Sequence, residues 1–266
     1  MSAQYIHGHH ESVLIAHRRR TAANSAAYLL EHLGPGNSLL DVGSGAGTIT
    51  ADLAGLVAPG QVWAVERTWS ALDLTMAETA ARGRGNVTGV VADAAALPFA
   101  DRAVDVVHAH QVAQHLAGPV DALTEWRRVC AADGVVAVRD ADYAAFTWGP
   151  ELPELDRWRQ LYLAEARASG GEPNAGRHLA GWAKAAGFSQ VEVTTSEWRY
   201  AEPAQRAAWG LTWAERTEES AFAQRVVDSG RATPAELAQI ATAWRTWAAT
   251  DDAWFVVPHT EILARP

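Results

Sequence analysis

The stretch that decides the fold reads Leu39-Leu40-Asp41-Val42-Gly43-Ser44-Gly45-Ala46-Gly47-Thr48. Its first residues have the apolar character of a buried strand, the glycines form a turn, and a helical pattern over 48–57 follows. Glycine adopts backbone torsions that other residues avoid, so such a turn lets the main chain come close to a ligand. The N-terminus of the following helix offers N–H groups to an acceptor. The stretch therefore predicts a ligand-binding strand–turn–helix unit.

Short apolar runs and helical patterns alternate on both sides of this turn up to about residue 138. We expect strands at 38–42, 62–66, 87–92, 104–109 and 135–138, with helices at 48–57, 70–81 and 120–131. Such continuously apolar strands, separated by helices, are typical of a parallel sheet covered on both faces. Two later strands are expected at 191–200 and 253–263. The sequence thus predicts an α/β fold with a doubly wound, seven-stranded, mostly parallel sheet.

Helical segments flank this sheet in the sequence. We expect helices at 11–33, 153–168, 176–186 and 203–250, the first stopped by Gly34-Pro35-Gly36 and the last broken near Gly230 and Pro234. The chain is expected to form one globular unit with an N-terminal lid and helix (1–33), a ligand-binding core (34–142) and a part that completes the sheet (143–266). Within the last part, the insertions 143–175 and 203–250 are expected to cap the carboxyl edge of the sheet.

Composition excludes several classes of protein. The 266 residues carry a net charge of -9, which argues against a nucleic-acid partner. Cys130 is the single cysteine, so an internal disulfide and a cysteine-based zinc site are excluded. No run approaches the roughly 20 apolar residues that span a bilayer, and residues 1–10 lack an apolar signal core. We therefore expect a cytoplasmic protein without membrane insertion, and nothing in the composition excludes a homo-oligomer.

Two N-terminal groups of residues allow either a structural or a ligand-binding interpretation. The run Arg18-Arg19-Arg20 is expected to be a solvated helix face, with contact to an acidic ligand group as the alternative. His7, His9 and His10 lie close together, but no carboxylate or cysteine stands at a metal-ligand spacing from them. We expect no metal site, and expect the segment to act as a lid.

The glycine pattern separates two kinds of cofactor site. A dinucleotide fingerprint G-x-G-x-x-G would place its third glycine at Thr48, whereas this chain has G-x-G-x-G with Asp41 two positions before the first glycine. The pattern resembles motif I of the class I S-adenosylmethionine (SAM) dependent methyltransferases, which have a Rossmann-like fold. The resemblance implies that the backbone of Gly43, Ser44 and Gly45 holds the methionyl part of SAM. It also implies that Asp41 organises the loop and the SAM amino group.

Two later carboxylates stand where this resemblance requires them. Glu66 ends the second strand and can accept hydrogen bonds from both hydroxyls of a ribose, although a dinucleotide enzyme could use it in the same way. Arg67 follows it, in a Glu-Arg-Thr sequence that departs from the acidic-x-Ser frequent in the family. By resemblance, Asp93 accepts from the adenine amino group and the Ala94 N–H donates to the ring. Leu97-Pro98-Phe99 then resembles the segment that follows in this family.

The ends of the fourth and fifth strands carry the candidates for catalysis. The stretch 104–116 resembles the family's D-x-V-x-x-x-x-x-x-x-H-L, which would place His110 and Gln111 beside the sulfonium. His110 is a candidate for catalysis or for orienting the acceptor, while His115 has a structural or acceptor-contacting role. Asp142 and Tyr143 follow the fifth strand; Asp142 is a candidate general base, with loop hydrogen bonding as the alternative for both residues.

Tryptophan indicates the kind of acceptor. Ten of the twelve tryptophans lie at or beyond Trp126, and several fall in the expected cap, where they supply flat apolar walls. We expect the acceptor to contact Tyr5, His115, Tyr143, Trp148 and Trp213, with further walls from Trp158 and Trp209.

These features together predict methyl transfer from SAM to a small molecule. The pattern over 34–139 most resembles the ubiquinone/menaquinone C-methyltransferase-like group, whose core is a methyltransferase type 11 domain. This implies in-line methyl transfer to an apolar or aromatic acceptor, quinone-like or natural-product-like, with S-adenosylhomocysteine (SAH) as the product. A methyltransferase acting on protein or RNA and an NAD-binding oxidoreductase are the alternatives.

Overall fold

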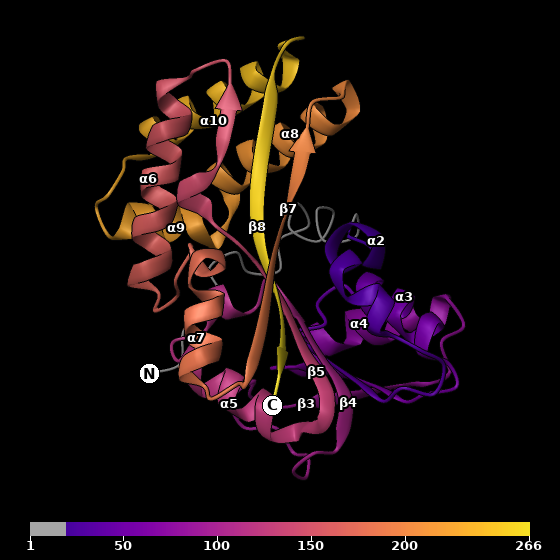
Figure 1. Ribbon diagram of the computed structural model, residues 1–266. Coiled ribbons are helices and arrows are strands. Elements are labelled where there is room, and N and C mark those ends of the chain that lie inside the picture. The colour runs from indigo at the N-terminus through magenta and orange to yellow at the C-terminus, as the bar shows by residue number, and fades with distance from the viewer. Residues whose placement is uncertain (1–19) are drawn as a thin grey trace.

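The computed structural model describes residues 20–266, and an eight-stranded sheet runs through them (Figure 1). The strands lie in the order β3-β2-β1-β4-β5-β8, with β7 on the other side of β8 and a short β6 beside the far end of β8. Their bounds are β1 Leu39–Val42, β2 Val62–Glu66, β3 Val87–Val91, β4 Val104–His110, β5 Cys130–Ala141, β6 Thr147–Gly149, β7 Gln190–Tyr200 and β8 Trp254–Arg265.

The pairing confirms a doubly wound sheet. Strands β1 to β5 pair in parallel, and β8 is antiparallel to its neighbours. From β1 the chain moves outward through β2 to β3, then returns to place β4 on the other side of β1. This reversal opens a crevice at the carboxyl ends of β1 and β4, where ligands bind in such sheets.

Helices cover both faces of the sheet. Those of the described residues are α2 Ala22–Ser25, α3 Thr48–Val57, α4 Trp69–Ala81, α5 Pro119–Val129, α6 Pro153–Ala168, α7 Leu179–Ala185, α8 Pro203–Glu219, α9 Ala221–Asp228 and α10 Pro234–Ala249. One apolar core joins α5 and α7 to the sheet, and a second joins α2 and α3 to it. No helix within residues 20–266 is long and apolar enough to cross a membrane.

Three sequence expectations need correction. The segment 22–33 is not one helix: a capping box between Thr21 and Asn24 starts α2 at Ala22, and a 3-10 turn at Ala27–His32 replaces its continuation. Helix α4 begins at Trp69, one residue before the expected start, because Thr68 caps it: the Thr68 hydroxyl accepts from the Ala71 N–H at 3.3 Å. The sheet has eight strands rather than seven because Thr147–Gly149 pairs with β8 over only three residues, too few to show a pattern.

The long β7–β8 pair joins the sheet to a helical cap. Its ladder is continuous from Gln190 opposite Arg265 to Tyr200 opposite Phe255. One end of β8 pairs with β5 in the central sheet, whereas its other end pairs with β6. Figure 1 shows helices α6, α8, α9 and α10 gathered around that second end. The cap is therefore attached to the core by an unbroken run of backbone hydrogen bonds.

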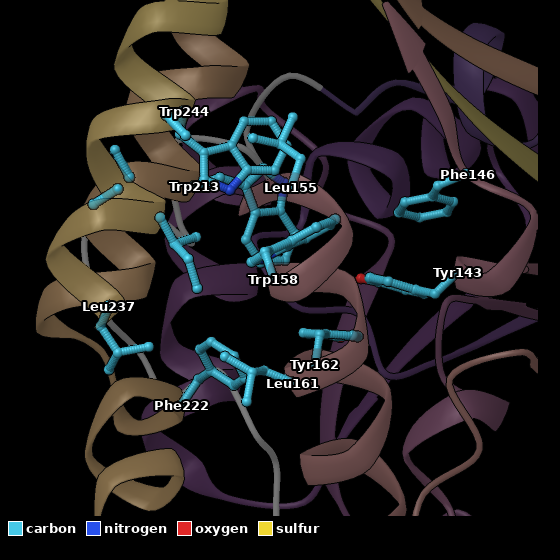
Figure 2. Close-up of a cluster of buried hydrophobic side chains, with 14 of the residues drawn as sticks. Tyr143, Phe146, Leu155, Trp158, Leu161, Tyr162, Trp213, Phe222, Leu237 and Trp244 are labelled. Atoms are coloured by element: carbon cyan, nitrogen blue, oxygen red, sulfur yellow. The ribbon is translucent and has the colours of Figure 1, made fainter. Parts of the chain in front are cut away.

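The cap has an apolar core of its own, centred on Trp158 (Figure 2). The Trp158 ring meets Trp213 and Trp244 edge-on, at centroid distances of 4.5 and 5.0 Å. Tyr162 stacks on Tyr143 at 4.2 Å, so the cluster continues to the end of β5. Edge-to-face packing of this kind adds to the free energy gained by burying large aromatic surfaces.

Candidate functional site

The glycine turn after β1 forms the floor of the crevice. Gly43, Gly45 and Gly47 have φ angles of 73°, 57° and 79°, in the left-handed region that favours glycine. Thr75 of α4 holds the turn, because its hydroxyl donates to the Gly45 carbonyl at 2.8 Å and lies 2.9 Å from the Ser44 hydroxyl. The turn is thus fixed from outside, and its backbone faces the crevice.

Asp41 organises the turn from below. His108 Nδ1 donates to Asp41 Oδ1 at 2.7 Å, and Thr50 Oγ1 donates to Oδ2 at 2.5 Å. Asp41 and His108 are both buried, so these bonds join β1, β4 and α3 behind the loop. The geometry agrees with an organising role for Asp41, whose carboxylate also borders the crevice.

Glu66 and Asp93 stand at the ends of the two next strands. Glu66 Oε1 accepts from the Gly45 N–H at 2.7 Å, and Oε2 accepts from the Arg67 N–H at 3.3 Å. Asp93 Oδ1 accepts from the Ala95 N–H at 2.9 Å. A carboxylate has about four lone-pair positions, so these bonds leave acceptor capacity for a diol or an amine. The left-handed glycines and this set of acceptors fit the methionyl, ribose and adenine parts of SAM.

Replacing Asp93 by alanine tests the adenine end of the site. Asp93 is exposed, so Asp93→Ala is expected to leave the fold intact. A hydrogen bond to a charged group contributes about 1.5–3 kcal/mol, so the affinity for SAH should fall at least about tenfold. Calorimetric titration with SAH measures this, and an unchanged dissociation constant would show that the adenine is held elsewhere.

One cavity joins this cofactor end to a region beneath the cap. Its volume is about 980 Å³, at the upper end of the range of about 300–1,000 Å³ for small-molecule sites. Beyond the glycine turn it is bordered by the end of β4, by β7, by α8 and by the residues after β5. We call this part the acceptor chamber; its walls are Arg20, His110, Gln114, His115, Tyr143, Phe146, Trp198, Tyr200, Trp209, Thr212, Trp213, Arg216 and Val257.

His110 lies where the two parts of the cavity meet. It is buried, and neither of its ring nitrogens has a hydrogen-bond partner within residues 20–266. Burial, together with the nearby Arg20 and Arg139 guanidiniums, holds the pKa of His110 well below its usual range. The imidazole is therefore neutral at pH 7, with one N–H donor and one acceptor nitrogen available to a ligand. It suits an orienting hydrogen bond better than strong base catalysis.

Gln111 is held in place beside His110. It has a φ of 55°, and its backbone N–H donates to the Arg139 carbonyl at 2.7 Å. Its side-chain oxygen accepts from Arg20 Nη2 at 2.8 Å, and its amide nitrogen donates to His259 Nε2 at 2.9 Å. Gln111 borders the cavity, its side chain also fixes Arg20, and its predicted contact with SAM stays a prediction.

Asp142 and Trp148 do not have the positions predicted for them. Both Asp142 oxygens accept from Arg177, at 2.6 and 2.7 Å, and Asp142 does not border the cavity. It is therefore not placed to act as general base. Trp148 stacks on Phe255 and lies under Arg159, outside the cavity wall. Trp158 is likewise in the cap core rather than in the wall.

The other predicted contacts divide into two groups. His115, Tyr143, Trp209 and Trp213 border the cavity. Burial and the charge of Arg20 lower the pKa of His115 to about 4, so it is neutral at pH 7. Tyr5, the lid, and the histidines at 7, 9 and 10 lie outside the described residues.

Sequence reasoning named Trp209 and Trp213 as walls but missed others, among them Trp198, Tyr200 and Arg216. Trp198 and Tyr200 alternate along β7, and Trp209, Trp213 and Arg216 are spaced i, i+4 and i+7 on α8. These spacings place each set on one face of its element. That signal was present in the sequence, but it does not show that the face borders a cavity rather than a dry core.

Asp140, next to the wall at the end of β5, gives a test of pH dependence. Burial raises its pKa to about 8, and the Gln114 and Ala113 N–H groups lie close without reaching good hydrogen-bond geometry. The folded state thus keeps a proton that the unfolded chain has lost, so stability falls as pH rises from about 4 to 8. The buried histidines change the stability only below about pH 6.5, where histidines of the unfolded chain become protonated. Asp140 therefore dominates the pH dependence of the free energy of unfolding between about pH 6.5 and 8.

We expect the free energy of unfolding to fall in that window by up to about 1.4 kcal/mol per pH unit. Asp140→Asn removes the titration and should flatten the profile. Urea unfolding at several pH values measures both slopes. Equal slopes for the two proteins would show that Asp140 does not titrate in this range.

Comparison with known proteins agrees with this geometry. Residues 40–138 match the family model of a methyltransferase domain. The chain is 30% identical to an uncharacterised methyltransferase of Schizosaccharomyces pombe, over 97% of this chain and 95% of that protein. It is 27% identical to the probable methyltransferase ltbC of Aspergillus luteorubrus, over 98% and 96% of the two chains.

A solved structure shows the same fold. The YcgJ protein of Bacillus subtilis superposes with a TM-score of 0.58 at 17% identity, over 90% of this chain and 97% of that one. The full-length match to the fission-yeast methyltransferase and the matched domain cover the glycine turn, Glu66, Asp93 and the end of β4. The chain therefore belongs to the class I SAM-dependent methyltransferases and is an enzyme that uses SAM.

Proposed function

We propose that this enzyme methylates a small, largely apolar or aromatic molecule, quinone-like or natural-product-like, bound in the acceptor chamber. The observation that carries the proposal is the continuous cavity that connects the glycine turn to aromatic walls beneath the cap. Trp213 is buried in that wall, and Tyr200 and Trp209 stack face to face with centroids 4.2 Å apart. Flat, conjugated molecules pack well against such surfaces.

The chain's own residues contribute position and exclusion of water. When bound, SAM supplies a methyl group already activated by the positive sulfur. Glu66, Asp93 and the glycine turn would hold SAM at the cofactor end of the cavity, and the end of β4 lies where that end meets the acceptor chamber. His110 offers a hydrogen bond to the acceptor there, while the aromatic walls fix its plane and keep water out. Alignment of donor and acceptor then supplies much of the rate enhancement.

The walls disfavour a macromolecular acceptor. His110, Trp213 and Arg216 are almost completely buried, so the acceptor must enter beneath the cap to reach them. A folded protein or RNA does not insert into a chamber of this size, although an extended peptide or a flipped base would fit.

Binding and transfer experiments test the proposal in sequence. SAH should bind with micromolar affinity and NAD should not bind, as measured by calorimetry. Release of SAH from SAM should then follow the addition of flat aromatic small molecules, and not of tRNA or unfolded protein. Trp209→Ala should raise the KM for such an acceptor about tenfold and leave SAH affinity unchanged. Trp69→Ala is the matched control, because Trp69 is exposed and lies outside the cavity wall. Methylation of RNA or protein alone would overturn the proposal.

A further inference from the structure

The two ends of the cavity carry opposite charge. Asp41, Glu66 and Asp93 border the cofactor end, where they suit a ligand with a sulfonium and an amine. Arg20, Arg199 and Arg216 border the acceptor chamber. The carboxylate that reaches this chamber from the described residues is Glu197, which is exposed and neighbours the exposed Arg199 on β7.

Arg20 and Arg216 each lie on a tryptophan of the chamber wall. The Arg216 Cζ is 5.1 Å from the centre of the Trp213 ring, and Arg216 is 5% exposed. The Arg20 Cζ is 5.3 Å from the centre of the Trp198 ring, and its Nη2 is anchored on Gln111. A guanidinium is a planar fork of donors that combines stacking on aromatic faces with paired hydrogen bonds to a carboxylate or a similar oxygen anion.

The two guanidiniums act on the same space. Burial raises the pKa of Tyr143 and of Tyr200, and for both phenols Arg216 and Arg20 oppose the rise. Both phenols and both arginines are wall residues of the chamber, so both cations act on the space that it encloses. Arg139 also lies on Trp198, with its Cζ 4.9 Å from the ring centre, but it pairs with Glu261 at 3.0 Å and does not border the cavity.

We infer that the acceptor is a flat aromatic molecule bearing a negatively charged oxygen group, held between Arg20 and Arg216. This rests on the proposed function. The low dielectric of the chamber strengthens attraction to an anion, so a carboxylate, an ionised phenol or an enolate is favoured over its neutral counterpart. His110 adds a neutral hydrogen bond beside the two cations.

The charge balance of the reaction supports such an acceptor. An anionic nucleophile gives its electron pair to the methyl carbon, the carbon–sulfur bond breaks, and the bonding pair goes to sulfur. The negative acceptor and the positive sulfonium both become neutral at the reacting centre. No proton has to be removed by the enzyme, which agrees with Asp142 lying outside the cavity. An acceptor bound through a carboxylate uses the same two arginines for position.

Matched acid and amide probes test the inference. Calorimetry of the SAH-saturated enzyme with 2-naphthoate and with 2-naphthamide compares two ligands of nearly equal shape that differ in charge. We expect naphthoate to bind at least about tenfold more tightly. Arg216→Gln and Arg20→Gln should each remove most of that preference, and Arg216→Lys should restore part of it. Lys184→Gln should leave it unchanged, because Lys184 is exposed and lies outside the cavity wall. A nitrophenol, whose visible absorption reports ionisation, should show a lowered pKa when bound, which identifies phenolate recognition.

The outcomes separate this inference from the proposed function. Equal affinities for acid and amide, or no binding of either to the SAH-loaded enzyme, overturn the inference while the methyltransferase assignment stands. A failure to bind SAH overturns the proposed function itself. Unchanged SAH affinity in each variant shows that it has folded, and Arg20→Gln provides a second test if Arg216→Gln does not fold.

Discussion

Gly47→Ala is expected to lower the affinity for SAH by at least about a hundredfold. Gly47 has a φ of 79°, and an added Cβ would lie 2.7 Å from the Thr75 Cα and 2.9 Å from its carbonyl oxygen. Left-handed torsions cost about 1–2 kcal/mol for other residues, and these contacts are with backbone that cannot rotate away. Because Thr75 holds Ser44 and Gly45, moving it displaces the whole glycine turn. Calorimetry with SAH and thermal unfolding measure the two consequences.

Gly83→Ala is the matched control for this variant. Gly83 has a φ of 66° in the loop after α4, but nothing lies within 4 Å of an added Cβ. It should lose about 1 kcal/mol of stability through the torsion alone and bind SAH normally. If both variants bound SAH as the wild type does, the contact with Thr75 would not control the turn.

Trp158→Ala should lower the free energy of unfolding by about 3–5 kcal/mol. The side chain is completely buried among the aromatic residues of the cap, and its removal leaves a large apolar cavity (Figure 2). At about 2–4 °C per kcal/mol for a chain of this size, the midpoint of thermal unfolding should fall by roughly 6–20 °C. Scanning calorimetry or urea unfolding measures the loss.

Trp69→Ala is the matched control, because it removes an indole that is not buried in the cap. Trp69 is 68% exposed at the start of α4, so its replacement should change stability by no more than about 0.5 kcal/mol. A Trp158 variant as stable as the Trp69 variant would mean that the cap repacks without cost, contrary to the dense packing around Trp158.

Local patterns predicted the sheet well. The strand–turn–helix at 39–57 and the strands up to β5 follow from apolar runs and glycines. Each of these strands is buried, so its own residues must be apolar, and the pattern can be recognised without knowing its neighbours. The class of cofactor followed from Gly43, Gly45, Glu66 and Asp93 in the order that the family resemblance requires. The short strand β6 could not be predicted, since its three residues are fixed by pairing with β8, more than 100 residues further along.

The acceptor chamber was only partly predictable, because its walls depend on tertiary packing. Trp158 and Trp209 lie on similar amphipathic helices, yet one is in the dry cap core and the other in the wall. Asp142 does follow β5, but it forms a salt bridge with Arg177, 35 residues later in the chain. Arg20 came from a run expected to be a solvated helix face, and the structure instead places it on Trp198.

The position of β8 between β5 and β7 has a consequence for how the protein is made. Asp140 of β5 pairs with Thr260 of β8, so the partner is synthesised 120 residues later (260 − 140). At about 5–20 residues per second, a ribosome needs roughly 6–24 s to reach it. During that interval β5 presents an unpaired edge to other nascent chains, and such edges promote aggregation. We therefore expect the yield of folded enzyme to depend on the interval before this late pairing more than on formation of the SAM-binding half.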